Sequence, residues 1–151
     1  MVEIRRVPAS ETFALRHRVL RPHVTIDEVA LPGDDDADTG HFAAYDESGN
    51  VIGTATVRRE SPPEEWGEPE GWRLRGMATE ESLRGQGIGA AVLGAAIAHV
   101  AEHGGGLFWC NARMSALTFY ERAGFVTRGE MWVDPDIGPH IRMWRRVDPA
   151  D

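Results

Sequence analysis

The sequence predicts a mixed α/β sheet in a single domain that spans residues 1–151. Short segments rich in β-branched and apolar residues are separated by turn residues, as strands are. Three other segments carry apolar residues as helices do, and the longest one lies between two strands, as in a βαβ unit. A length of 151 residues suits one hydrophobic core. The expected order of elements is β-α-β-β-β-α-β-α-β-β.

The first half of the chain is expected to supply three strands and one helix. Ser10 is the predicted N-cap of that helix, which runs through Leu15 and ends or kinks near Pro22. Turn residues at 46–50 separate two strand-like segments, which predicts a hairpin. The expected strands are residues 2–7, 41–46 and 51–58, and the expected irregular segments are residues 27–39 and 61–70.

The second half is expected to hold the longer helix. Apolar residues recur at helical spacing from residue 87 to residue 103, and three consecutive glycines follow. A shorter helix is expected at residues 115–123, again with a glycine after it. The expected strands of this half are residues 72–78, 107–111, 125–133 and 140–147.

Charge is distributed unevenly along the chain. The net charge of −8, from 16 basic and 24 acidic residues, argues against a general nucleic-acid-binding protein. Residues 27–70 hold thirteen of the acids and two of the arginines, whereas residues 71–128 hold six arginines and four acids. The acidic first half either attracts a cationic amine or is a solvated surface.

Composition excludes several classes of protein and site. The one cysteine, Cys110, cannot form an internal disulfide and is expected to pack inside an apolar strand. His99 and His103 form an i, i+4 pair without an evident third ligand, so no metal site is expected. The apolar stretches are too short to span a membrane, and the N-terminus does not resemble a signal peptide, so a cytoplasmic location is expected.

A glycine-rich loop precedes the long helix. Glycines at 85, 87 and 89 let backbone N–H groups converge on a phosphate at the helix N-terminus, although such a turn also serves simply to enter a helix. All basic residues are arginines, which excludes a Walker loop. The dinucleotide pattern G-x-G-x-x-A is present, but the polar residues 79–84 separate it from the strand. The pattern R-x-x-G-x-G, starting at Arg84, fits better.

Residues 75–79 and 84–89, followed by the helix 90–103, resemble the pyrophosphate motif of the GNAT N-acetyltransferase superfamily. Residues 116–125 resemble its A-x-x-F-Y-x-x-x-G-F segment, in the correct order and spacing. The resemblance implies a mixed, mostly antiparallel sheet with flanking helices, in which strands 72–78 and 107–111 splay apart. It also implies acetyl-CoA as co-substrate.

The resemblance further implies which residues contact acetyl-CoA. The backbone of the first strand would pair with the pantetheine arm, the glycine loop would hold the pyrophosphate, and one amide and one aromatic side chain would contact the arm. The strand residues are Met77, Ala78 and Thr79, and the loop residues are Arg84, Gly85, Gln86, Gly87, Ile88 and Gly89. The amide is that of Asn111, and the aromatic side chain is that of Phe119. An asparagine found in many members seven residues before the motif tyrosine is Arg113 here, a departure from the pattern.

Acetyl transfer to an amine needs a proton donor for the departing sulfur and a proton acceptor for the amine. Tyr120 stands at the position of the family's general acid. His140 is the preferred base, because an imidazole titrates near neutrality and the surrounding G-P-H-I-x-M resembles a pattern near the acceptor site of some members. The other candidates for the base are Asp27, Glu28, His41 and Glu60, or a chain of water molecules.

The function that the resemblance implies is direct transfer of an acetyl group to an amine. The acceptor is a small-molecule amine or a protein or peptide amine, and a homodimer is compatible with the family. Two alternatives stay open: an enzyme that uses another acyl-CoA, and a non-catalytic sensor or interaction module that binds acetyl-CoA or CoA.

Overall fold

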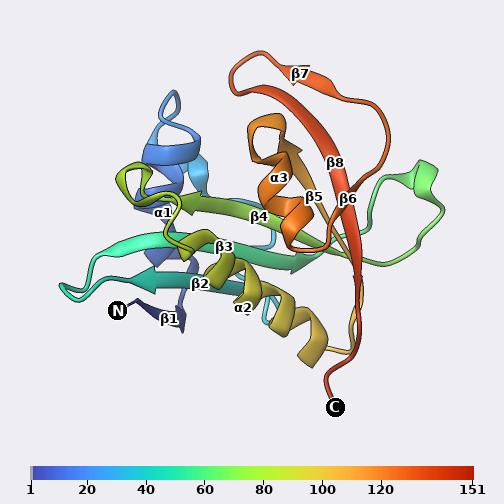
Figure 1. Cartoon of the computed structure of the whole chain (residues 1–151), viewed down its shortest axis with the longest axis horizontal. Coiled ribbons are helices and arrows are strands. Elements are labelled where there is room, and N and C mark those ends of the chain that lie inside the picture. Colours follow the sequence, from blue (N-terminus) through green and yellow to red (C-terminus); the bar gives the residue numbers. More distant parts are fainter. Residues whose placement is uncertain (1) are drawn as a thin grey trace.

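One eight-stranded mixed sheet forms the centre of the molecule (Figure 1) in a computed structural model that describes residues 2–151. The strand order is β1-β2-β3-β4-β5-β8-β6, with β7 paired to β8, and only β4 and β5 are parallel. The strands are β1 (Glu3–Arg6), β2 (Gly40–Tyr45), β3 (Val51–Arg59), β4 (Trp72–Thr79), β5 (Gly106–Arg113), β6 (Val126–Thr127), β7 (Trp132–Asp134) and β8 (Gly138–Val147). This order of elements confirms the predicted fold class.

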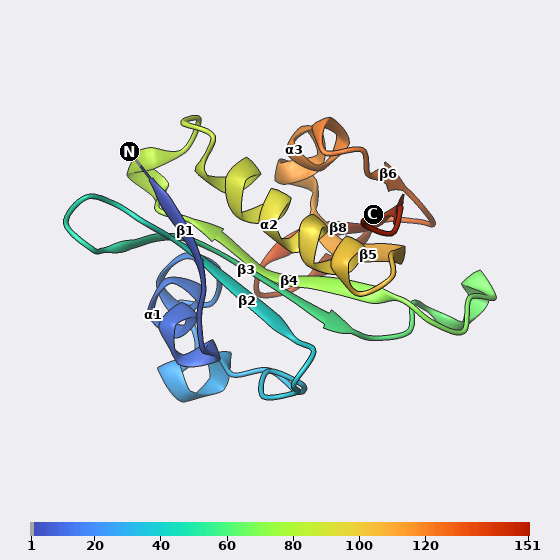
Figure 2. The same cartoon turned by 90° about the horizontal axis from the view of Figure 1, so that it is seen from below.

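Helices cover both faces of the sheet (Figure 2). On one face lies α1 (Phe13–Leu15), which continues a 3₁₀ turn and runs into a π-helical segment. On the other face lie α2 (Ile88–Glu102) and α3 (Leu117–Arg122). The short 3₁₀ and π segments are Ala9–Thr12, Arg16–Leu20, Ile26–Val29, Glu64–Trp66, Glu81–Leu83 and Met114–Ala116. Within residues 2–151, none of these helices has the length and apolar character that a membrane span requires.

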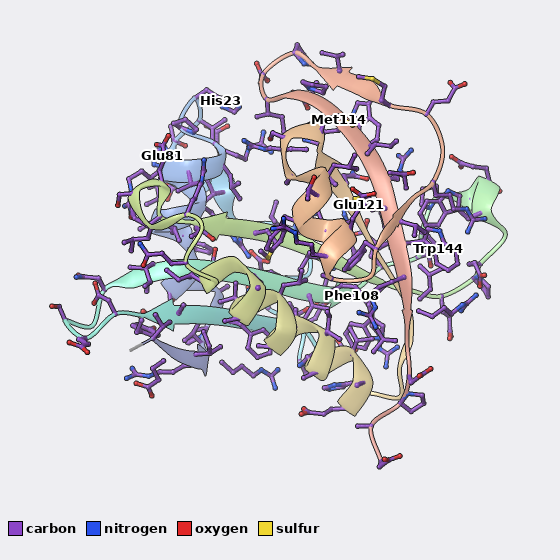
Figure 3. All side chains as sticks on the ribbon, viewed as in Figure 1. His23, Glu81, Phe108, Met114, Glu121 and Trp144 are labelled. Atoms are coloured by element: carbon purple, nitrogen blue, oxygen red, sulfur yellow. The ribbon has the colours of Figure 1, made fainter. Side chains whose placement is uncertain are left out.

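The core lies between the sheet and α2. Val92, Ala96 and Val100 recur at helical spacing and are fully buried against β-strand residues that include Phe108. Phe108, buried in this core, and Glu121, exposed on α3, are both labelled in Figure 3. The long helix therefore forms where its apolar spacing predicts it, and its first residue is fixed against the sheet close to the glycine loop.

Strands β4 and β5 diverge after two paired positions. Their register contains only Trp72 with Phe108 and Arg73 with Trp109. Strand β4 stays paired to β3 on its other side, but the register shifts between Thr54 and Thr56 because β4 carries a bulge there. Gly76, in this bulge, has a φ of 60°, which a residue with a Cβ adopts only under strain. The second half of β4 thus has a backbone edge that does not pair with β5.

Two local predictions were wrong. Ser10 does not cap the first helix: the 3₁₀ turn begins at Ala9 after Pro8, and no side chain caps it. The expected strand 125–133 is divided into β6 and β7, because Gly129 has a φ of 88° and breaks the extended path between them. Both short strands still pair with β8.

Candidate active site

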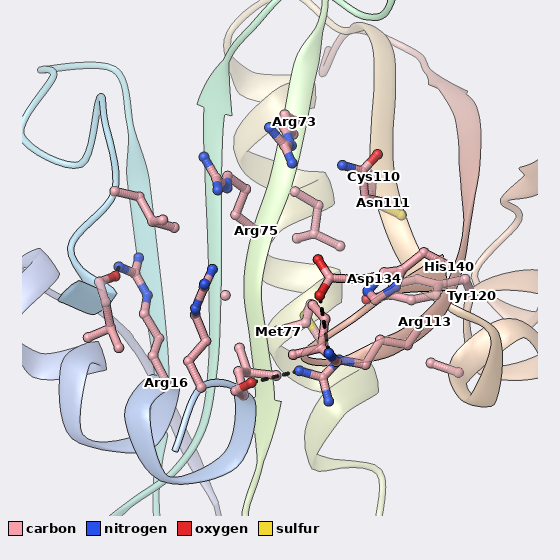
Figure 4. Close-up of a pocket in the computed structure, with 18 of the residues that line it drawn as sticks. Arg16, Arg73, Arg75, Met77, Cys110, Asn111, Arg113, Tyr120, Asp134 and His140 are labelled. Carbon is pink, nitrogen blue, oxygen red and sulfur yellow. Dashed lines mark hydrogen bonds between the residues drawn. The ribbon is translucent and has the colours of Figure 1, made fainter. Parts of the chain in front are cut away.

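A cavity of about 330 Å³ opens where β4 and β5 diverge. Figure 4 shows Arg16, Arg75 and Met77 on one side of it and Asn111 and Tyr120 on the other. Residues of the π segment, β4, β5, α3, β7 and β8 contribute to its lining. The gap in the sheet is therefore closed into a pocket by elements from both halves of the chain.

The glycine loop presents a row of unused hydrogen-bond donors. None of the N–H groups from Gly85 to Ala90 finds an acceptor among the described residues. Gly85 and Gly87 have φ angles of 84° and 82°, and a Cβ at either would meet no atom within 4 Å. Since the last three of these donors belong to the N-terminus of α2, the loop has the charge and the open space to bind a phosphate. Arg84 is exposed beside it.

The start of α2 packs closely on two of the predicted cofactor residues. A Cβ added to Gly89 would lie 3.2 Å from Phe119 and 3.3 Å from the Thr79 hydroxyl, so only glycine fits there without a shift. Phe119 also contacts Tyr120, with ring centroids 5.1 Å apart. Phe119 thus links the glycine loop to the cavity.

Asn111 carries a buried side-chain acceptor that has no partner. Its Oδ1 atom is inaccessible to solvent and receives no hydrogen bond within residues 2–151, although the side chain lines the cavity. A buried amide oxygen without a donor costs about 1–3 kcal/mol. A ligand N–H in the gap between β4 and β5 would satisfy it.

Tyr120 reaches the cavity from α3. Its side chain is buried, and its hydroxyl makes no hydrogen bond within the described chain. The pKa of Tyr120 is raised above its ordinary value, mainly by burial and to a smaller extent by the neighbouring Cys110. The phenol therefore stays protonated. Burial also raises the pKa of the Cys110 thiol to about 12, which keeps it out of the reactive thiolate form.

His140 is the one candidate base that lines the cavity. Its ring stacks on Trp132, and its Nδ1 lies 2.8 Å from the carbonyl oxygen of Gly138. Because a carbonyl only accepts, Nδ1 is the donor of this hydrogen bond, and the neutral tautomer that fits it has its lone pair on Nε2.

The other base candidates lie outside the cavity lining. Asp27 and Glu28 are exposed, and Glu28 is occupied in a capping box with Thr25. Glu60 forms an ion pair with Arg73 at 2.8 Å. His41 is buried on β2, where both ring nitrogens are engaged, with the Thr56 hydroxyl of β3 and the Asp34 carbonyl, each at 2.8 Å.

A buried ion pair between Arg16 and Asp34 packs against the β4 bulge beside the cavity. The sequence analysis did not predict it. Arg16 is 2% exposed and bonds Asp34 at 2.8 Å and the Thr56 hydroxyl at 2.7 Å. Its Nε atom lies against the β4 bulge, where a Cβ on Gly76 would come within 2.8 Å of it. The pair therefore leaves room at the bulge only for glycine.

The cavity lining is basic. It contains Arg16, Arg21, Arg73, Arg75, Arg113 and His140, and Asp134 is its one acid. None of the thirteen acids in residues 27–70 belongs to it. The acidic segment 27–70 therefore contributes no carboxylate to the lining of this pocket. Arg113, the departure from the family pattern, lines the cavity and donates to the Leu20 carbonyl at 2.8 Å.

Comparison with known proteins agrees with this arrangement. The model described as Acetyltransferase (GNAT) family matches residues 8–125. The chain belongs to the GNAT acetyltransferase family. It is 34% identical over 147 residues to the uncharacterized N-acetyltransferase YitI of Bacillus subtilis (strain 168), covering 97% of each chain. The predicted resemblance is confirmed, and the chain is an acyltransferase of this family.

Solved structures share the fold at lower identity. A phosphinothricin acetyltransferase of Sinorhizobium meliloti, in complex with AcCoA, superposes with a TM-score of 0.75 at 18% identity, over 97% of this chain and 89% of that one. The ribosomal-protein-S18-alanine N-acetyltransferase of Escherichia coli superposes with a TM-score of 0.72 at 17% identity, over 100% of this chain and 97% of that one.

Within residues 2–151, no group of three or more His, Cys, Asp or Glu side chains could hold a metal ion.

Replacing Gly87 with alanine is expected to weaken acetyl-CoA binding about tenfold, because the left-handed backbone of the loop becomes strained by about 1–2 kcal/mol and its donors tilt. Isothermal titration calorimetry measures the change. Gly94→Ala, at an exposed helical glycine of α2 with open space around it, is the matched control. Acetyl-pantetheine, which lacks the pyrophosphate, should lose no affinity. An equal loss for both ligands would contradict the role of the loop.

Proposed function

We propose that the protein transfers the acetyl group of acetyl-CoA directly to an amine of a small molecule, protein or peptide. The proposal is supported by one cavity, lined by Asn111, Tyr120 and His140, that meets the unpaired edge of β4. Bound acetyl-CoA would supply the acetyl group as a thioester, whose carbonyl carbon accepts the amine nitrogen. The residues around the cavity then have three tasks. They bind the cofactor, polarise the thioester carbonyl and transfer protons.

Binding is assigned to the backbone more than to side chains. The free loop N–H groups from Gly85 to Gly89 hold the pyrophosphate, and the Arg84 side chain adds positive charge, whereas the Arg84 N–H donates to the Glu81 carbonyl at 3.4 Å. The open edge of β4 at Met77, Ala78 and Thr79 pairs with the pantetheine amides. Asn111 Oδ1 accepts a hydrogen bond from the same arm, and Phe119 packs against it.

Two side chains move the protons. A backbone N–H near Met77 or Ala78 polarises the thioester carbonyl. Tyr120 donates its phenolic proton to the leaving sulfur, and burial keeps that proton in place until the sulfur departs. His140 Nε2, left free by the Nδ1 bond to Gly138, accepts the proton of the amine.

The test is binding followed by turnover. Acetyl-CoA should bind saturably in calorimetry, and thiol release with an amine panel should yield an acetylated amine by mass spectrometry. Binding without thiol release from any amine would favour the non-catalytic sensor, and absence of binding would exclude both functions. A cytoplasmic location, a homodimer, a lack of nucleic-acid and membrane partners and a single domain over residues 1–151 stay predictions from the sequence.

A further inference from the structure

Arg75 lies in the wall of the cavity without a partner. Its guanidinium makes no hydrogen bond or ion pair within residues 2–151, although its side chain is partly buried. Burial, together with the neighbouring Arg73, lowers its pKa to about 10. A cation placed in such a site is stabilised when an anion joins it.

The other arginines of the lining differ from Arg75. Arg16 is occupied by Asp34 and Thr56, Arg113 by the Leu20 carbonyl, and Arg21 is exposed. Arg73 pairs with Glu60 and lies over the Trp109 ring at 4.9 Å. The lining contains five arginines and one acid, Asp134, and two of these arginines pair with Asp34 and Glu60. When all three acids are subtracted, an excess of two positive charges is left. The field of the cavity therefore favours an anionic guest.

The phosphates of acetyl-CoA do not account for this charge. The loop that presents free N–H groups to a pyrophosphate follows Thr79, at the end of β4. Arg75 lies four residues earlier on the same strand, at most roughly 13 Å from Thr79, since the bulge at Gly76 shortens the path. The thioester end of the cofactor, which enters between β4 and β5, carries no charge. An anion bound by Arg75 would therefore belong to the other substrate.

We propose that the acceptor is an amine that also carries a carboxylate or a comparable oxyanion, which Arg75 binds while the amine faces His140. The inference rests on the proposed function. A guanidinium presents paired donors that match a carboxylate, which gives it orientation as well as charge. Arg75 comes from β4 and His140 from β8, with β5 between them in the sheet order. The two groups thus hold the two ends of the acceptor from separate walls.

The test compares acceptors that differ in one charge. The panel consists of phenylalanine and of ω-amino acids of increasing length, each paired with its own carboxamide, together with spermidine and a lysine-containing peptide. We expect the better acids to exceed their amides by about 10- to 100-fold in kcat/KM. Arg75→Gln should reduce that ratio to near one, Arg75→Lys should retain part of it, and the Kd for acetyl-CoA should not change.

Arg122→Gln is the matched control, because it removes the same charge from the exposed end of α3, outside the cavity. Circular dichroism establishes that each variant folds. Preference for spermidine, for the peptide or for the amides would overturn the inference while leaving acetyl transfer intact. So would an Arg75→Gln enzyme that keeps the wild-type ratio.

A second measurement does not depend on turnover. Glutarate, a dicarboxylate without an amine, is titrated calorimetrically into the CoA-saturated protein. Saturable binding that Arg75→Gln abolishes and Arg122→Gln preserves would support the anion site even if no amine of the panel is acetylated. Absence of glutarate binding to the wild-type protein, together with the absence of any acid preference, would overturn it.

Discussion

Replacing Tyr120 with phenylalanine is expected to lower kcat by about 10²- to 10⁴-fold, the range over which a positioned general acid contributes. The phenol is buried, and its raised pKa keeps it protonated across the working pH range, so it can donate to the leaving sulfur. Its hydroxyl has no hydrogen-bond partner within the described chain, so its removal leaves no polar group unsatisfied. Stability and the Kd for acetyl-CoA should therefore stay nearly unchanged.

The measurement is steady-state thiol release, with urea unfolding and calorimetry alongside. The only other tyrosine provides the control: Tyr45→Phe removes a hydroxyl that donates to Glu11 at 3.2 Å, far from the cavity lining, and should leave kcat unchanged. The wild-type rate should not decline from loss of the Tyr120 proton below about pH 10, since its pKa lies above 10.0. Unaltered turnover in Tyr120→Phe would remove this residue from the mechanism.

The parts of the fold that the sequence predicts well are those whose local signals agree with each other. The helix that starts after Gly87 has both apolar spacing and flanking glycines, and it is found within one residue of its expected ends. The break at Gly129 was missed because apolar residues on both sides continue a strand pattern, and only the left-handed φ of that glycine interrupts it. Ser10 has the right chemistry for a cap, but the turn begins one residue earlier.

The site is predictable where its groups are near in sequence. The loop from Arg84 to Gly89 and the pair Phe119 and Tyr120 belong to contiguous motifs, and the fold brings them together. The charge of the cavity was not predictable from regional counts. Acids of the first half turn to solvent or pair with arginines, as Glu60 does with Arg73, while the partly buried Arg75 faces the cavity. Which charged side chains face the cavity depends on the strand register and on the β4 bulge. Amino-acid composition predicts neither of these.

The second large effect is expected from Asp34→Ala. Arg16 and Asp34 are buried together, 18 positions apart in the chain, and nothing in the local sequence marks an arginine of a helical segment as buried. Removing the carboxylate leaves the Arg16 charge in the interior with neutral partners: the Val29 carbonyl, the Thr56 hydroxyl and, at 3.5 Å, the His41 Nδ1 atom. We expect the free energy of unfolding, measured in urea, to fall by about 3–5 kcal/mol.

An exposed pair gives the comparison. Arg59 and Asp38 lie 2.9 Å apart with half-exposed side chains, so Asp38→Ala should cost less than about 1 kcal/mol. A similar small loss for Asp34→Ala would mean that water reaches Arg16 and that the pair does not support the bulge. The two outcomes also differ at the active site: because Arg16 lies against Gly76, a displaced guanidinium should lower kcat in Asp34→Ala but not in Asp38→Ala.

The pH dependence follows from the same pair. Burial by itself raises the pKa of Asp34, but the hydrogen bonds from Arg16 and from the Leu31 N–H outweigh it and hold the pKa below its ordinary value of 3.8. A depressed carboxyl pKa stabilises the fold fully above the unfolded pKa, and that contribution is lost as pH falls through the folded pKa. Wild-type stability should therefore drop below about pH 4. In Asp34→Ala this part of the acid-dependent loss should be missing, so the two urea-unfolding curves should converge as the pH is lowered.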